Sequence, residues 1–241
     1  MIDLDIPEDF EKIIRDKRVV IVGPAEYLTG RSSGTKIDNY DVVIRPNCFF
    51  LPEKAHVDYG SRTDIMYHNM ASVYLSGLQE QVKNNPEVFK SLQYVVGSAI
   101  KAGPQDHAWS GWSDDHKSEC ATNFDKLKID EVPYWWIGVP NYKKTHDLVG
   151  GCEPYTGISS IIITTACKPK ELHVTGFDFY SGSKVYADGY LASVDRDQEI
   201  RNRGGGHGSG CTDINKNYVR SWKNEYNFVS VDDHMESILT P

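Results

Sequence analysis

The segment after the first apolar run carries small residues of the kind that phosphate-binding loops use. Val19 to Val22 is followed directly by Gly23-Pro24-Ala25. A small residue at the end of a strand lets backbone amides approach a phosphate group. The chain contains neither a GxGxxG dinucleotide pattern nor a GxxxxGK[ST] P-loop. On these residues alone, the segment predicts either a phosphate-binding loop or a buried strand with an ordinary turn.

Two short acidic clusters have the residue types of a divalent-cation site. Asp195-Arg196-Asp197 has the DxD spacing that holds Mn²⁺ or Mg²⁺ on nucleotide diphosphates, and Asp114-Asp115-His116 also carries ligand-type side chains. Acidic pairs are common in polar loops that bind no metal. We therefore expect no metal site, and an activity that is sensitive to EDTA would contradict this expectation.

The cysteines form no pattern of paired residues. They are Cys48, Cys120, Cys152, Cys167 and Cys211, an odd number without a CxxC pair. This set argues against a zinc knuckle and against a complete disulfide framework. We expect free thiols.

Alternating helix and strand patterns must position these residues. Acidic residues in the first turn and the spacing of apolar residues predict a short helix over 7–14, and the apolar run 18–23 predicts a strand covered on both faces. Further strands are expected at 41–45, 64–68, 94–97, 172–176 and 228–231, and further helices at 72–83, 156–166 and 217–225. The alternation predicts an α/β fold with a doubly wound, mostly parallel sheet, whose ligand crevice lies beyond the carboxyl ends of the strands.

The length of 241 residues and the ordinary globular composition predict one domain over 1–241. Two stretches break the helix and strand pattern, and we expect long loops or lids near 103–133 and 180–212. The second of these contains His207 within the glycine-rich segment Gly204 to Gly210.

Charge and hydropathy exclude several partners. The formal net charge of −8 opposes broad attachment to nucleic acid or to anionic lipid. The chain has no run of 18 apolar residues, and its first residues lack the basic and apolar regions of a signal peptide. We expect a cytoplasmic protein with no membrane span.

Five segments in order resemble the motifs of glycosyltransferase family 29, the eukaryotic-type sialyltransferases. Val19–Leu28, Gly34–Asn47 and Tyr59–Asp64 are similar to the large sialyl motif, with an apolar strand, a tight turn, an I-D-x-x-D element, an R-x-N element and a G-x-[KR]-T element. Pro154–Gly157 and Leu172–Phe177 are similar to the small sialyl motif. The resemblance implies a GT-A-like sialyltransferase variant of a Rossmann-like sheet, in a short soluble microbial or viral member of the family.

The resemblance also implies where a nucleotide-sugar donor binds. The expected donor contacts are Gly23, Pro24, Ala25, Asn47, Asn69, Tyr155, Thr156 and Gly157. Asn47 offers both an amide donor and an acceptor, and Thr156 and Gly157 open a helix whose free amides attract a phosphate or carboxylate. Without the resemblance, Asn47 is explained as a turn residue and Thr156 as a plain N-cap.

For catalysis, the resemblance points to His207 as the general base. Histidine suits this task because its pKa lies near neutrality, so that it can accept the proton of an acceptor hydroxyl. The family has a further histidine in a loop before the base, whereas this chain has Tyr186 and Tyr190 in that neighbourhood. We expect a tyrosine hydroxyl there to bond the departing phosphate.

Three departures from the family pattern bear on the donor and the compartment. Pro24 stands where the family usually has asparagine, and Tyr155 stands where it has serine. Val19 replaces the first cysteine of the family's motif-linking disulfide, which agrees with a reducing compartment.

The resemblance implies a metal-independent, inverting transfer of a sialic acid or related keto-sugar acid from a CMP-sugar to a glycan hydroxyl, without a further cofactor. One alternative is a glycosyltransferase with a different donor, such as a UDP-sugar, acting on a glycan or a modified nucleobase. A second is a non-catalytic carbohydrate-binding protein that stacks sugars on tryptophans. Its candidate tryptophans are Trp109, Trp112, Trp135 and Trp136.

Overall fold

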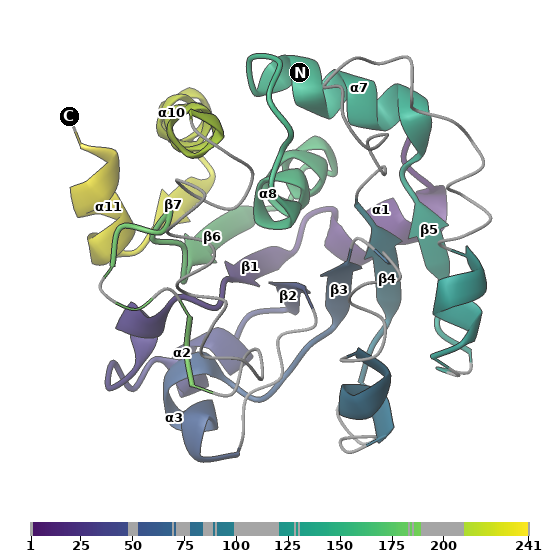
Figure 1. The fold of residues 1–241 in the computed structure, drawn as a ribbon, viewed down its shortest axis with the longest axis horizontal. Coiled ribbons are helices and arrows are strands. Elements are labelled where there is room, and N and C mark those ends of the chain that lie inside the picture. Colours follow the sequence, from purple (N-terminus) through teal and green to yellow (C-terminus); the bar gives the residue numbers. More distant parts are fainter. Residues whose placement is uncertain are drawn as a thin grey trace.

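The central feature of the fold is a seven-stranded sheet in the order β5-β4-β3-β2-β1-β6-β7 (Figure 1). All six neighbouring pairs are parallel. The strands are β1 Arg18–Val22, β2 Val42–Pro46, β3 Ile65–His68, β4 Tyr94–Gly97, β5 Tyr134–Trp136, β6 Glu171–Thr175 and β7 Val229–Val231. The structure is a computed structural model that describes residues 2–47, 53–68, 70, 78–83, 89, 91–98, 121–127, 129, 131–182, 184, 186–188 and 210–240.

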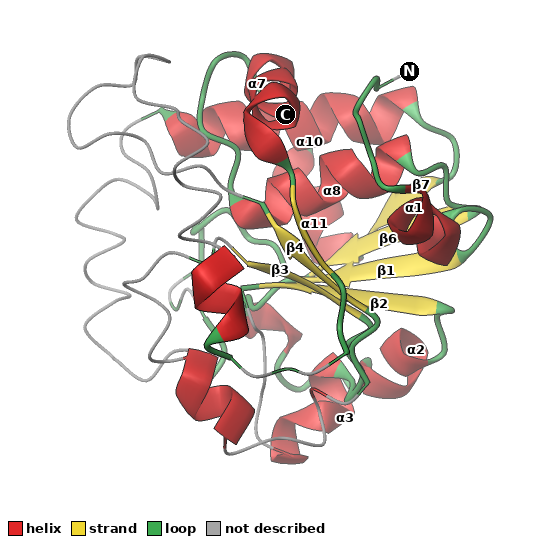
Figure 2. Ribbon diagram, turned by 90° about the vertical axis from the view of Figure 1, so that its right-hand side faces the viewer, coloured by secondary structure: helices red, strands yellow, loops and turns green. Residues whose placement is uncertain are grey.

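Helices cover both faces of the sheet (Figure 2). Besides helical residues at 78–83 and 121–125, the helices are α1 Glu8–Ile14, η1 Glu26–Leu28, α2 Gly34–Asp38, η2 Glu53–Ala55, α3 His56–Tyr59, α7 Gly138–Leu148, α8 Thr156–Ala166, α10 Cys211–Glu225 and α11 Asp233–Leu239. In Figure 2, α8 and α10 lie above the sheet and α2 and α3 lie below it. The result is the three-layer, doubly wound α/β architecture that the sequence predicts.

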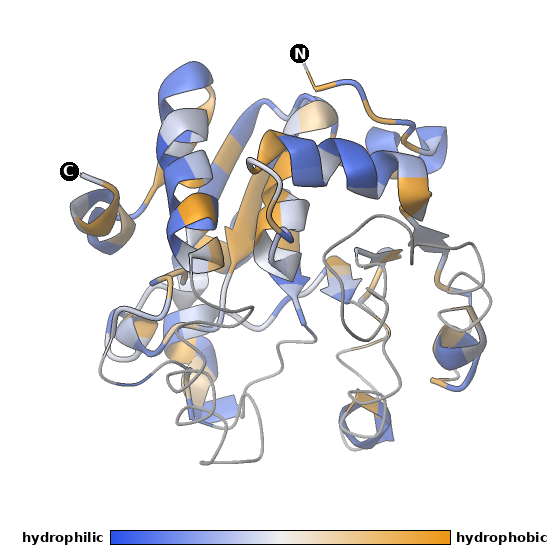
Figure 3. Cartoon of the chain, turned by 45° about the horizontal axis from the view of Figure 1, so that its top comes forward, coloured by the Kyte–Doolittle hydropathy of each residue, from blue (hydrophilic) through white to orange (hydrophobic). Residues whose placement is uncertain are grey.

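The first strand lies in the interior of the sheet, as its continuous apolar run predicts. Strand β1 pairs with β2 on one side and with β6 on the other, and four of its five residues are buried. Val19 and Ile21 pack in one core cluster and Val20 and Val22 in the other, since alternate side chains of a strand face opposite layers. Apolar residues accordingly colour the strands at the centre of Figure 3, while polar ones lie along the outer helix faces.

Six strands agree with the predicted ranges to within about one residue, and the predicted helices at 7–14 and 156–166 are confirmed. Strand β5 and helix α7 were not expected, and α10 begins at Cys211 rather than at Asn217. Of the predicted helix 72–83, residues 78–83 are described and helical. The missed strand is only three residues long, which is too short to show an alternating pattern.

Strand β5 corrects part of the carbohydrate-stacking interpretation. Trp136 is 9% exposed and belongs to the main core, and the Trp135 ring lies 5.5 Å from the Phe10 ring of α1. Both tryptophans therefore pack within the fold and are not a free platform for sugars. Trp109 and Trp112 lie outside the described residues.

Candidate active site

A pocket of about 100 Å³ opens at the carboxyl ends of β1, β2 and β6, beside the start of α8. The sheet runs one way from β1 through β2 and the other way through β6, so the pocket lies at the topological switch point where ligands of such sheets bind. Its lining comes from five separate segments of the chain. The lining residues are Pro24, Ala25, Pro46, Asn47, Tyr155, Thr156, Gly157, Ile158, Gly176, Phe177, Asp178, Phe179, Tyr180 and Tyr186.

The pocket brings together seven of the eleven residues that the sequence singled out for donor binding and catalysis. They are Pro24, Ala25, Asn47, Tyr155, Thr156, Gly157 and Tyr186. Gly23 lies next to the pocket rather than in its lining. The remaining three, Asn69, Tyr190 and His207, lie outside the described residues.

Gly23 has a different use from the one expected. Its amide donates to the carbonyl oxygen of Thr175 over 2.8 Å, the amide of Ala25 donates to that of Gly176 over 3.0 Å, and Pro24 has no N–H. The expectation that these backbone amides are free to approach a phosphate is therefore wrong. Glycine is needed at position 23 because a Cβ there would lie 2.3 Å from the Gly176 carbonyl oxygen.

Asn47 follows β2 directly, forms a turn and lines the pocket. Its φ of 60° is left-handed, a conformation that asparagine tolerates better than most residues, so it does form the turn. Its backbone N–H donates to the carbonyl oxygen of Tyr67 over 2.6 Å. The residue is exposed and lines the pocket.

The start of α8 faces the pocket with Thr156 and Gly157. Tyr155, rather than Thr156, is the N-cap residue, and its side chain makes no capping hydrogen bond. The first amides of a helix have no partner within the helix, and with the helix dipole they attract anions. A Cβ on Gly157 would lie 2.2 Å from the Phe177 ring, so this glycine lets α8 and the segment after β6 meet closely.

Three tyrosines form one wall of the pocket. The ring of Tyr180 lies edge-on to Tyr155 at 5.7 Å and edge-on to Tyr186 at 6.4 Å. Burial raises the pKa of Tyr180 well above its usual value, and the hydroxyl of Tyr186 raises it further, so Tyr180 stays a neutral hydrogen-bonding group. Tyr186 is held beside Ala25 because the two residues form an antiparallel bridge and the amide of Ala187 donates to the Pro24 carbonyl.

Sequence reasoning missed Phe177, Asp178, Phe179 and Tyr180 as pocket residues. The carboxylate of Asp178 is buried and accepts hydrogen bonds from the amides of Tyr180 and Gly182, at 2.9 and 3.2 Å. Burial raises the pKa of Asp178. Their position in the sequence could have indicated this role. The run Phe177-Asp178-Phe179-Tyr180 directly follows the predicted strand at 172–176, and ligands of such sheets bind at the carboxyl ends of the strands.

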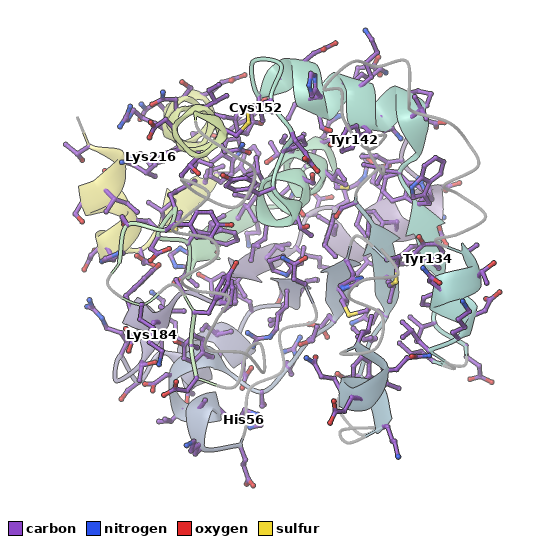
Figure 4. The ribbon with its side chains drawn as sticks, in the orientation of Figure 1. His56, Tyr134, Tyr142, Cys152, Lys184 and Lys216 are labelled. Atoms are coloured by element: carbon purple, nitrogen blue, oxygen red, sulfur yellow. A yellow bond between two sulfur atoms is a disulfide. The ribbon has the colours of Figure 1, made fainter. Side chains whose placement is uncertain are left out.

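The expectation of free thiols is wrong for Cys152 and Cys211, which form a disulfide between the loop before α8 and the first residue of α10 (Figure 4). Cys167 is free and buried, and Cys48 and Cys120 lie outside the described residues. Disulfides persist in oxidising environments. The cysteines therefore no longer support a reducing compartment or the cytoplasmic location that was expected.

Hydrogen bonds strengthen this junction between α10 and the pocket loop. The hydroxyls of Tyr155 and Thr212 lie 2.6 Å apart. The buried Asn215 side chain accepts from the Tyr155 amide at 3.3 Å and donates to the carbonyls of Glu153 and Cys211. Tyr155, which departs from the family serine, thus links the pocket to α10.

Metal and membrane features follow from the part of the chain that is described. Within it, no group of three His, Cys, Asp or Glu side chains could hold a metal ion. The clusters at Asp114-Asp115-His116 and Asp195-Arg196-Asp197 lie outside it. No helix among the described residues is long and apolar enough to cross a membrane.

The family model for glycosyltransferase family 29 (sialyltransferase) matches residues 8–188, three quarters of the chain. The chain belongs to this family. It is a glycosyltransferase of the sialyltransferase type, as the motif resemblance implied. No curated protein matches the sequence.

Solved structures with a fold similar to that of this chain include a bacterial and a mammalian sialyltransferase. The α-2,3-sialyltransferase Cst-I from Campylobacter jejuni is 15% identical, with 99% of this chain and 82% of that chain covered at a TM-score of 0.62. CstII from the same organism, in complex with cytidine-5'-monophosphate, is 14% identical, with 90% and 80% covered at 0.56. A mammalian sialyltransferase in complex with Gal-beta-1-3GalNAc-ortho-nitrophenol is 18% identical, with 92% and 71% covered at 0.51. At these identities the likeness shows a shared fold.

Proposed function

We propose that the protein transfers a sialic acid, or a related keto-sugar acid, from a CMP-sugar to a hydroxyl group of a glycan, with inversion at the anomeric carbon. The observation that carries the proposal is the pocket at the β1–β6 switch point, where family motif residues from distant segments meet. CstII, which shares the fold, is described with bound cytidine-5'-monophosphate.

The pocket chemistry suits a monophosphate leaving group. Thr156 at the start of α8 lines the pocket, and so do Tyr180 and Tyr186, which carry hydroxyl groups. In the transfer, negative charge grows on the phosphate as its bond to the sugar breaks, and fixed hydrogen-bond donors stabilise that charge. We assign this role to Thr156 and Tyr186, with Tyr180 beside them and Tyr190 as a further candidate. The proposed transfer uses no metal ion.

His207 is the proposed general base. It would take the proton of the acceptor hydroxyl while that oxygen bonds to the anomeric carbon and CMP leaves with the bonding electron pair. His207 lies five residues before Thr212, whose hydroxyl is 2.6 Å from that of the pocket residue Tyr155. Five residues of extended chain span up to ~18 Å, which is long enough to let His207 approach the pocket.

A nucleotide screen by thermal unfolding tests the donor class. A ligand that binds only the native state raises the unfolding temperature by mass action. CMP should stabilise the protein, and UDP and GDP at the same concentration should not. Stabilisation by UDP alone would contradict the CMP-sugar proposal and favour a UDP-sugar donor. Pro24 and Tyr155, which depart from the family pattern, would then be the residues to explain the different donor.

Substitution of the base tests the mechanism. His207→Ala should lower turnover roughly a hundredfold or more and leave CMP affinity unchanged, because a general base acts in the chemical step. His173→Ala is the matched control, since His173 lies within β6 and bonds the hydroxyl of Ser230 away from the pocket. Near-normal transfer by His207→Ala would place the base elsewhere.

A further inference from the structure

A partly buried carboxylate outside the pocket lining joins three elements of the fold. Asp232 is the N-cap residue of α11, and its Oδ1 accepts from the Met235 amide at 2.8 Å. Its Oδ2 accepts from two hydroxyls, those of Thr175 at the end of β6 and of Tyr27 in η1, the latter at 2.6 Å. The end of β6, the loop after β1 and the start of α11 therefore converge on one side chain.

Tyr27 carries this connection to the pocket wall. Its O–H group donates to Asp232, and its hydroxyl oxygen accepts from the amide of Gly176 at 2.6 Å. Burial and the Asp232 carboxylate raise the pKa of Tyr27, so the hydroxyl keeps its proton at neutral pH and the direction of both bonds is fixed. The His234 ring stacks on the Tyr27 ring, with 3.9 Å between centroids and 23° between planes, and so limits rotation of the tyrosine.

The amide that Tyr27 holds is at the corner where β6 turns into the pocket. Gly176 has a φ of 81°, a left-handed conformation, and its carbonyl accepts from the amide of Ala25. Phe177, Asp178 and Tyr180, which follow it, line the pocket. An interaction that fixes Gly176 therefore sets the direction in which these side chains leave the sheet.

We propose that Tyr27 and Asp232 are positioning residues for the donor pocket, acting through the amide of Gly176 on the segment Gly176–Gly182. Neither residue lines the pocket. The identity of the nucleotide rests on the proposed function, whereas the connection from Asp232 through Tyr27 to Gly176 does not. It predicts that a change at Tyr27 disturbs the pocket wall more than an equal change elsewhere in the sheet.

Tyr27→Phe is the direct test, because it removes only the hydroxyl and keeps the ring on His234. It leaves the Gly176 amide and one Asp232 oxygen each short of a hydrogen-bond partner. Tyr40→Phe is the matched control, since the Tyr40 hydroxyl also donates to a carboxylate, that of Glu171, at 3.2 Å. Glu171 lies at the amino end of β6, whereas Gly176 follows its carboxyl end.

The first measurement needs no ligand. Hydrogen exchange followed by mass spectrometry should show exchange within 176–182 about tenfold faster in Tyr27→Phe than in wild type, because a buried amide has lost its acceptor. Tyr40→Phe should leave this segment unchanged. Unchanged exchange in Tyr27→Phe overturns the proposal, whatever the nucleotide measurements give.

The second measurement is CMP affinity by calorimetry. Tyr27→Phe should weaken CMP binding about tenfold, whereas Tyr40→Phe should stay within about twofold of wild type. Equal weakening by both variants would show a general loss of stability and overturn the positioning role. If wild type does not bind CMP, the proposed donor fails, and the exchange result alone then decides the role of Tyr27.

A second variant guards against loss of folding. Asp232→Asn keeps an oxygen for the α11 cap and should give the same faster exchange within 176–182. Combined with Tyr27→Phe it should add little, because both substitutions break the same connection. Additive effects would mean that the two residues act separately and would contradict the proposal.

Discussion

Gly23 and Gly176 meet backbone to backbone at the base of the pocket. A Cβ on Gly23 would lie 2.3 Å from the carbonyl oxygen of Gly176, and a Cβ on Gly176 would lie 2.3 Å from that of Gly23. The Ala25 amide bonds the Gly176 carbonyl, and the Gly23 amide bonds Thr175 next to it. This contact joins the segments that follow β1 and β6 at the point where the ligand crevice opens.

Gly176→Ala should therefore lower the free energy of unfolding by about 3 kcal/mol or more, since the new methyl group meets backbone atoms that cannot rotate away. Gly30→Ala is the matched control. Gly30 has nearly the same φ, 80° against 81°, but no atom within 4 Å of a Cβ, so it should cost only about 1 kcal/mol. Urea denaturation measures both, and equal losses would mean that the close approach costs nothing.

The disulfide between Cys152 and Cys211 should contribute measurably to stability. It closes a loop with a sequence separation of 59 residues. Its removal in Cys152→Ser should cost about 2–4 kcal/mol, because the unfolded chain gains freedom. Dithiothreitol should lower the unfolding temperature of wild type and of Cys167→Ala, which keeps the bond, but not that of Cys152→Ser. A reductant response in Cys152→Ser would rule out this origin.

The hydroxyls of Tyr155 and Thr212 should be energetically coupled. In a double-mutant cycle, Tyr155→Phe and Thr212→Val should show an interaction of about 1 kcal/mol, as expected for a short hydrogen bond within the fold. A cycle between Tyr155→Phe and Thr29→Val is the control and should be additive to about 0.5 kcal/mol, since Thr29 bonds the Tyr59 hydroxyl instead. Additivity in both cycles would mean that the Tyr155 and Thr212 hydroxyls are not energetically coupled, and would contradict the prediction.

His68, the last residue of β3, should make stability depend on pH. It is 4% exposed, and burial lowers its pKa from 6.5 to about 4. Between these pH values the unfolded chain binds a proton that the folded protein does not, so stability falls as pH falls from 6.5 to 4, by up to about 3 kcal/mol. His68→Gln should flatten this part of the profile in urea denaturation. Its glutamine oxygen can still accept from the Met70 amide, as Nδ1 of His68 does. Parallel profiles for the two proteins would contradict the prediction.

Much of the pocket could be predicted from the sequence because its residues follow strands. An apolar run such as Val19 to Val22 indicates a buried parallel strand, and the residues just after such strands gather at one edge of the sheet. Asn47 and the start of α8 were found in this way, together with the family motifs. Strand β5 was missed because Tyr134–Trp136 is too short to carry a period.

The linear chain determined six of the described strands, the helices at 7–14 and 156–166, and the residues that stand at the ends of those strands, since these depend on local pattern and on motif order. The tertiary structure alone decided how those residues are used. Gly23 makes a close backbone contact with Gly176, Cys152 forms a disulfide with Cys211, and the Tyr155 hydroxyl lies 2.6 Å from that of Thr212 on α10. These are contacts between residues far apart in the sequence, and local patterns carry no information about the partner because it is brought near only when the sheet and its helices pack.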